Sequence, residues 1–130
     1  MQLKFELKGR PVPKQRPRRV QTASGQHITY TPKETKRFES RVRAAAYVEA
    51  RRQGWPQQYT GPVRATIILS FPDKRHGDAD NYAKTVLDGL QGQGGAIHDD
   101  RQVTDLRARI EHGKEGVSVL LEALNPLEGN

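Results

Sequence analysis

Apolar and polar residues alternate in four segments of this chain, with the period of a half-buried strand. The first two segments are residues 2–8 and 63–71. Ile68 adds an apolar residue to the second face of 63–71, which predicts a central strand covered on both faces. Alternation returns at 106–110 and 117–123 on either side of a glycine-containing turn. This arrangement predicts a hairpin of two adjacent strands.

Two further segments have the period of a helix. Thr31 and Pro32 predict a helix start, with a hydroxyl cap followed by proline at the first helical position. This helix should extend to about Gln53, and its narrow buried stripe comprises Phe38, Val42, Ala45, Ala46 and Glu49. A shorter helix is predicted at 81–91. The order β-α-β-α-β-β predicts a small α/β (α+β) domain, a mixed sheet with helices packed on it.

Length and charge narrow the class of protein. The 130 residues predict one domain, 1–130, with a frayed C-terminus at 125–130. The net charge of +7 favours a polyanionic partner, and nucleic acid is preferred because no apolar run could enter a membrane. The absence of cysteine excludes disulfides and thiolate chemistry. The N-terminus has no signal-peptide pattern, which predicts a cytoplasmic, nucleoid-associated protein.

A basic, proline-rich segment occupies residues 9–19. Three prolines favour extended backbone there, and six basic residues lie between Lys8 and Arg19 without an acidic one. An irregular loop or short hairpin should follow at 20–31. We expect the basic side chains to track DNA phosphates, with a solvated loop as the alternative. The predicted DNA-binding residues are Arg10, Lys14, Arg16, Arg18 and Arg19.

Acidic residues gather in one part of this basic chain. Asp78 and Asp80 follow the predicted central strand, and two residues apart in extended backbone they would point to the same side. Asp99 and Asp100 follow a glycine-rich loop that could return them to this pair. Converging carboxylates raise one another's pKa unless a cation binds, and Mg²⁺, or Mn²⁺ as a substitute, suits oxygen ligands.

Each of these residues also has a simpler interpretation. Asp80 or Asn81 could serve only as the cap of the short helix. Lys84, four residues after Asp80, could be a surface ion-pair partner contributing roughly 0.3–0.5 kcal/mol. Asp99 and Asp100 could form a solvated turn. The metal site is preferred because it accounts for all of these positions together.

The acidic segment resembles the RusA family of Holliday junction resolvases. The matching motifs are Asp78-Ala79-Asp80-Asn81, Lys84, Asp88-Gly89-Leu90 and Ile97-His98-Asp99-Asp100-Arg101-Gln102-Val103. The resemblance covers roughly residues 3–124, and its specific part is 78–103. His98 departs from the family, where a hydrophobic residue is common, but this does not affect the proposed ligands.

The resemblance implies a homodimer that resolves four-way (branched) DNA junctions by paired, Mg²⁺-dependent nicks in recombination and repair. It assigns the catalytic and metal-binding roles to Asp78, Asp80 and Asp100, and the essential lysine to Lys84. Asp88, Asp99 and Asn81 are supporting residues. We expect metal-activated water to hydrolyse the phosphodiester bond while Lys84 stabilises negative charge on the phosphate. The alternatives are a nuclease without junction preference and a non-catalytic basic module that binds nucleic acid.

Overall fold

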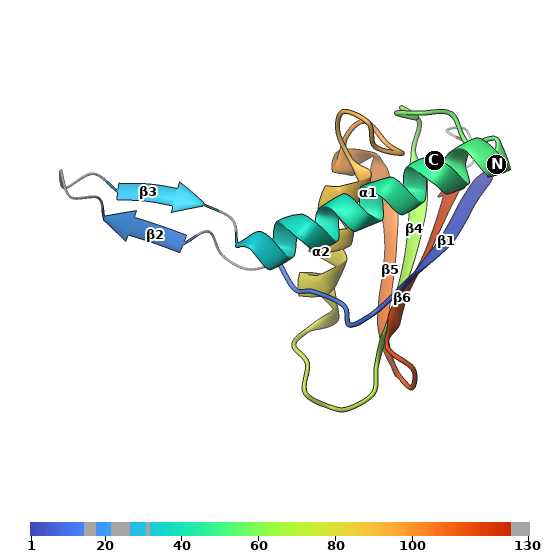
Figure 1. The fold of residues 1–130 in the computed structure, drawn as a ribbon. Coiled ribbons are helices and arrows are strands. Elements are labelled where there is room, and N and C mark those ends of the chain that lie inside the picture. Colours follow the sequence, from blue (N-terminus) through green and yellow to red (C-terminus); the bar gives the residue numbers. More distant parts are fainter. Residues whose placement is uncertain (15–17, 22–26, 31, 126–130) are drawn as a thin grey trace.

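The computed structural model describes residues 1–14, 18–21, 27–30 and 32–125. Its centre is a four-stranded mixed sheet of order β1-β6-β4-β5, and two helices pack against it (Figure 1). This is the predicted α+β class. The elements are β1 (Gln2–Lys8), β2 (Arg18–Gln21), β3 (His27–Tyr30), α1 (Lys33–Gln53), β4 (Val63–Phe71), α2 (Ala79–Leu90), the 3₁₀ turn η1 (Asp100–Gln102), β5 (Val103–His112) and β6 (Gly116–Ala123).

The helices cover one face of the sheet. Every second residue of β4, from Val63 to Phe71, is buried on this face together with Phe38 and Val42 of α1. The intervening residues, including Ile68, are only partly buried. β4 is therefore central, as predicted, but the prediction that both its faces are covered is wrong. Among the described helices, none is both long enough and apolar enough to cross a membrane.

The last two strands do not form the predicted hairpin. β4 lies between them: it pairs parallel with β5 and antiparallel with β6. The link between β5 and β6 passes the end of β4, where the Gly113 amide donates to the Phe71 carbonyl over 2.9 Å. The alternation identified both strands correctly. The short link between them, however, also allows β4 to lie between the two strands.

Both helices begin at positions other than those predicted. Pro32 is the N-cap of α1 and not its first helical residue, and Thr31 lies outside the described residues. α2 begins at Ala79, with Asp78 as its N-cap, so neither Asp80 nor Asn81 is the cap. Asp80 occupies the first turn, where the positive end of the helix dipole favours an acid. The prediction that Asp78 and Asp80 lie two apart in extended backbone is therefore wrong.

The region from 20 to 31 contains a hairpin, one of the two predicted alternatives. β2 and β3 pair antiparallel in a two-stranded sheet of their own, separate from the main sheet (Figure 1). Residues 22–26 lie outside the described residues.

The two helices approach each other closely at Gly89. A Cβ atom at this position would lie 2.7 Å from Cβ of Val42 and 2.8 Å from the Glu39 carbonyl oxygen. The absence of a side chain at Gly89 therefore sets how closely α2 packs against α1.

Candidate active site

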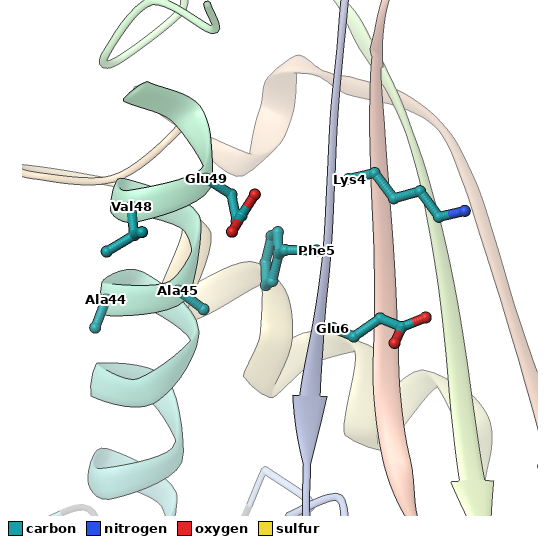
Figure 2. Close-up of a pocket in the computed structure, with 7 residues that line it drawn as sticks. All are labelled: Lys4, Phe5, Glu6, Ala44, Ala45, Val48 and Glu49. Carbon is teal, nitrogen blue, oxygen red and sulfur yellow. The ribbon is translucent and has the colours of Figure 1, made fainter. Parts of the chain in front are cut away.

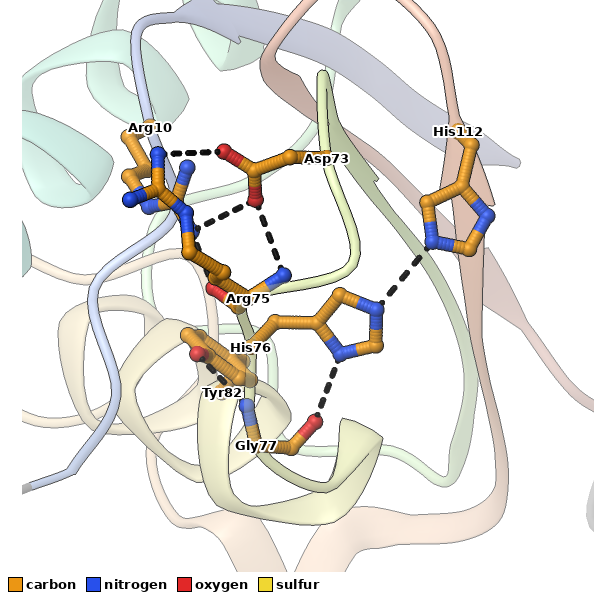
Figure 3. Close-up of polar contacts among 7 residues, drawn as sticks. All are labelled: Arg10, Asp73, Arg75, His76, Gly77, Tyr82 and His112. Atoms are coloured by element: carbon orange, nitrogen blue, oxygen red, sulfur yellow. Dashed lines mark hydrogen bonds and ion pairs between the residues drawn. The ribbon is translucent and has the colours of Figure 1, made fainter.

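The start of α2 is held against the end of β4. The ring of Tyr82 packs edge-on against Phe71, with centroids 5.1 Å apart. The Tyr82 hydroxyl accepts the Gly77 amide hydrogen over 3.0 Å (Figure 3). These contacts fix the first turn of α2 beside the carboxyl end of a buried strand, which is a common location for active sites in α/β proteins.

Three predicted site residues lie on this part of α2. Asp78 has extended backbone and its side chain makes no capping hydrogen bond. Asp80 and Lys84, one turn apart, are exposed. None of the three side chains forms a hydrogen bond or ion pair with another described residue. Asn81 contributes its backbone carbonyl, which accepts the Lys14 amide hydrogen over 3.1 Å.

The turn that carries Asp99 and Asp100 is built by two glutamines. Gln102 accepts the Asp99 amide hydrogen over 2.7 Å and donates to the carbonyls of Tyr59 and Gly61, at 2.6 and 2.9 Å. Gln91 accepts the Asp100 amide hydrogen over 2.8 Å. Gln102 belongs to the family motif, but the sequence indicated no role for it, and no pattern singled out Gln91.

Asp99 is paired within its own turn. Hydrogen bonds from the side chain and then the backbone of Arg101 lower the pKa of Asp99 to about 2. Its carboxylate also accepts the Arg101 amide hydrogen over 2.8 Å, forming a capping box with Gln102. Asp99 therefore contributes to the turn, and its supporting role at the metal site stays a prediction.

Asp88 is also paired, in this case with a predicted DNA-binding residue. The Lys14 ammonium lies 2.9 Å from carboxylate oxygens of both Asp88 and Glu39. Burial lowers the pKa of Lys14, but the hydrogen bonds and charges of these two acids outweigh it, and the pKa is raised. Lys14 thus fastens the proline-rich segment to both helices.

Arg10 has a similar anchoring position. Its guanidinium donates to Asp73 over 3.3 Å and to the Arg75 carbonyl (Figure 3). The same group lies 5.1 Å from the centroid of the Phe71 ring. Arg16 lies outside the described residues, and only the backbone of Arg18 and Arg19 is described. DNA binding by these five residues stays a prediction.

A histidine pair beside the start of α2 was not predicted. His76 stacks on Phe71. Its Nε2 atom lies 3.2 Å from Nε2 of His112 at the end of β5 (Figure 3). Its Nδ1 atom lies 3.0 Å from the Gly77 carbonyl oxygen. The pair joins the loop before Asp78 to the edge strand, although its two members are 36 residues apart in the sequence.

Ion pairs distinguish the aspartates predicted to bind metal from the other aspartates of the chain. The chain has seven aspartates, all within the described residues. Four form ion pairs with described lysines or arginines: Asp73, Asp88, Asp99 and Asp105. The three that form none with a described residue are Asp78, Asp80 and Asp100. In a chain with net charge +7, acids that form no ion pair with a described residue indicate positions available to an added cation, although the charge of Asp100 also acts on the neighbouring Arg101.

One chain does not bring these three side chains together. Asp100 is bonded to Gln91 just beyond the last turn of α2, and Asp80 is in the first. Gln91 is eleven residues after Asp80, which corresponds to about 16 Å along the helix axis. In the described part of the chain, no group of three acidic, histidine or cysteine side chains could hold a metal ion. The expected convergence within a single chain is not observed.

A groove elsewhere on the protein contains none of the predicted site residues. It lies between α1 and β1, where Phe5 points towards the helix (Figure 2). Its lining residues are Lys4, Phe5, Glu6, Ala44, Ala45, Val48 and Glu49. Asp78, Asp80 and Lys84 instead lie at exposed positions at the start of α2.

The fold and the exposed acids of α2 do not by themselves define a class of protein, and comparison with known families supplies it. A family model described as Endodeoxyribonuclease RusA matches residues 8–122. The chain therefore belongs to the RusA family of endodeoxyribonucleases. No curated protein gave a match to the sequence.

Proposed function

We propose that this protein is a homodimeric, Mg²⁺-dependent resolvase that cuts four-way DNA junctions by paired, symmetric nicks. The observation that carries the proposal is that Asp78, Asp80 and Asp100, to which the sequence resemblance assigns the catalytic role, are the aspartates that form no ion pair with a described residue. The whole chain, 1–130, would be one endonuclease domain acting on nucleoid DNA in the cytoplasm.

The proposed metal ligands are the same three aspartates, and Mn²⁺ would be a substitute for Mg²⁺. Hard cations favour carboxylate oxygens, so the donor chemistry fits. The arrangement of the three aspartates in one chain does not fit a single metal site, because Asp100 is at the far end of α2 from Asp78 and Asp80. Lys84 is an exposed cation one turn from Asp80 and would face the phosphate that is cut.

The decisive experiment compares Asp80→Asn with the parent on a four-way junction and on linear duplex of the same sequence. We expect the variant to bind the junction and to lose divalent-ion-dependent cleavage. Glu115→Gln is the matched control, because Glu115 is an exposed acid in the link between β5 and β6. Its cleavage should equal that of the parent.

The same assay separates the alternatives. Equal cutting of junction and duplex by the parent would favour a nuclease without junction preference. Tight junction binding with no cleavage in Mg²⁺ or Mn²⁺ would favour a non-catalytic module. Undiminished cleavage by Asp80→Asn would remove Asp80 from the catalytic set.

A further inference from the structure

Two histidine rings from distant parts of the chain point at each other beside the end of β4 (Figure 3). His76 belongs to the loop that follows β4, and His112 is the last residue of β5. The ring centroids are 5.3 Å apart and the two Nε2 atoms only 3.2 Å apart, so each Nε2 atom is directed at the other ring. The contact is exposed to solvent, and an ion can therefore reach both nitrogens.

The surroundings of His76 determine which of its two ring nitrogens carries the proton. Its Nδ1 atom lies 3.0 Å from the Gly77 carbonyl oxygen, which can only accept, so Nδ1 is the donor. The Nε2 atom of the neutral ring then carries a lone pair that is directed at His112. A ring N–H donated to a backbone carbonyl is also the arrangement that orients most histidines that bind metals. The Phe71 ring, whose centroid is 4.7 Å from that of His76, stacks on it and holds its plane.

The spacing of the two Nε2 atoms matches that of two imidazole ligands on one ion. With Zn–N bonds of about 2.0–2.1 Å, two nitrogens of a tetrahedral site lie about 3.3 Å apart. The observed separation is 3.2 Å. In the ion-free protein, a hydrogen bond from Nε2–H of His112 to His76 accounts for the same contact. Transfer of that proton to Nδ1 of His112 gives the other neutral tautomer, in which both Nε2 lone pairs are available to an ion.

We propose that His76 and His112 form a binding site for a late first-row divalent transition-metal ion, with Zn²⁺ as the probe. Imidazole suits Zn²⁺, Ni²⁺ and Cu²⁺, whereas Mg²⁺ prefers oxygen ligands. In the described part of the chain no third acidic or histidine side chain completes a group around them, so water would occupy the remaining positions. The site uses none of the proposed Mg²⁺ ligands and does not rest on the proposed nuclease function.

An ion at this site would join the loop 72–77 to β5. The two histidines are 36 residues apart in sequence, and only the folded chain holds their Nε2 atoms together. An ion that binds the folded chain in preference to the unfolded one stabilises it as the ion concentration rises. Zn²⁺ should therefore raise the melting temperature of the parent, and excess Mg²⁺ should not remove this effect.

A calorimetric titration with Zn²⁺ in excess Mg²⁺ tests the site directly. We expect one Zn²⁺ per chain for the parent and for His98→Ala, the matched control, because His98 is an exposed histidine outside the pair. His76→Ala and His112→Ala should each lose this binding step, since one imidazole alone does not chelate. A parent that binds no Zn²⁺, or either variant with the binding step intact, would overturn the proposal.

A structural effect of the substitutions is distinguished from loss of a ligand by measuring each melting temperature first without Zn²⁺. His112 is the more exposed partner, so His112→Ala should melt as the parent does and yet gain no stability from Zn²⁺. Nitrogen NMR of the parent gives a second measurement without any substitution. One equivalent of Zn²⁺ should shift the Nε2 resonances of His76 and His112 and leave those of His98 unchanged, whereas the reverse pattern would contradict the proposal.

The nearby aspartates provide the last control. Asp78→Asn and Asp80→Asn should both keep the Zn²⁺ binding step, because neither carboxylate belongs to the pair. Loss of Zn²⁺ binding in either variant would assign the ion to the acidic residues and refute the histidine site. A parent protein that fails to cut junctions would contradict the proposed nuclease function, and the Zn²⁺ titration would still decide whether the histidine pair binds an ion.

Discussion

Nζ of Lys14 lies 2.9 Å from a carboxylate oxygen of Asp88, which ties the segment leading to β2 to the third turn of α2. Glu39 of α1 accepts from the same ammonium. Both acids are largely shielded from solvent, with exposed side-chain fractions of 17% for Asp88 and 19% for Glu39. The contact places a basic residue of the proline-rich segment between two acids of the helical layer.

Replacing Lys14 should destabilise the fold. Lys14→Met leaves the carboxylates of Asp88 and Glu39 facing each other without their shared donor, at a cost of roughly 1–3 kcal/mol in the free energy of unfolding. Urea denaturation measures this loss. Adding Asp88→Asn to Lys14→Met should recover part of it by removing one of the two charges. A Lys14→Met variant as stable as the parent would show that the contact is not stabilising.

The same substitution tests whether Lys14 also contacts DNA. A lysine that neutralises a phosphate should, when removed, reduce the slope of log binding constant against log salt by about one unit. An unchanged slope together with reduced stability would assign Lys14 to the fold alone.

Gly89→Ala should separate α1 from α2. The added methyl group would lie 2.7 Å from Cβ of Val42, closer than packed carbon atoms allow, so we expect a loss of about 1–3 kcal/mol of stability. Thermal unfolding would detect it. Gly77→Ala is the control, because its Cβ would meet Tyr82 at an ordinary 3.8 Å. Equal melting temperatures for the two variants would contradict this account of the helix contact.

Gln102→Leu should release the turn that positions Asp100. The substitution leaves the Asp99 amide and the Gly61 carbonyl without the Gln102 side chain, while the Tyr59 carbonyl keeps only the His98 amide as donor. This loss should cost about 1–3 kcal/mol. Because Asp100 is a proposed ligand, junction cleavage should fall more than the folded fraction does. Gln93→Leu, at an exposed position, is the control. Cleavage that only followed the folded fraction would argue against a positioning role.

Acid should remove the contribution of Asp99 to stability. Its pKa falls from an ordinary value of 3.8 to about 2 because Arg101 bonds the charged form. A depressed folded-state pKa stabilises the protein above about pH 4, and this contribution disappears as the pH falls towards 2. Asp99→Asn should therefore flatten the dependence of unfolding free energy on pH between 4 and 2. An identical profile in the variant and the parent would contradict the pairing.

Much of the fold follows from local patterns, and the main errors concern which elements are neighbours. Alternation identified β1 and β4 with their observed bounds. It also identified β5 and β6, but a period of two carries no information about partners, and the insertion of β4 depends on contacts 40 or more residues apart in sequence. The starts of α1 and α2 were each misplaced because several residues near them can cap a helix.

For the candidate site, too, the sequence indicated the residues but not how the fold arranges them. Residue types and spacing indicated Asp78 and Asp80 together with Asp99 or Asp100, and only the family resemblance selected Asp100. Ion pairs in the structure distinguish Asp78, Asp80 and Asp100 from the other aspartates. Their expected convergence assumed that a glycine-rich loop would return the chain to its starting end. The parallel pairing of β4 with β5 sends the chain to the opposite end instead. Gln91 acts through a hydrogen bond formed only after folding.

The position of β6 affects how the protein can be synthesised. Residue Leu3 pairs with Leu121, and β6 is the strand that connects β1 to β4. Until Ala123 has emerged from the ribosome, β1 has no neighbour in the main sheet, and the apolar edge of β4 is open on that side. Nascent chains that stop before β6 should therefore depend on chaperones or be degraded, because they expose unpaired strand edges.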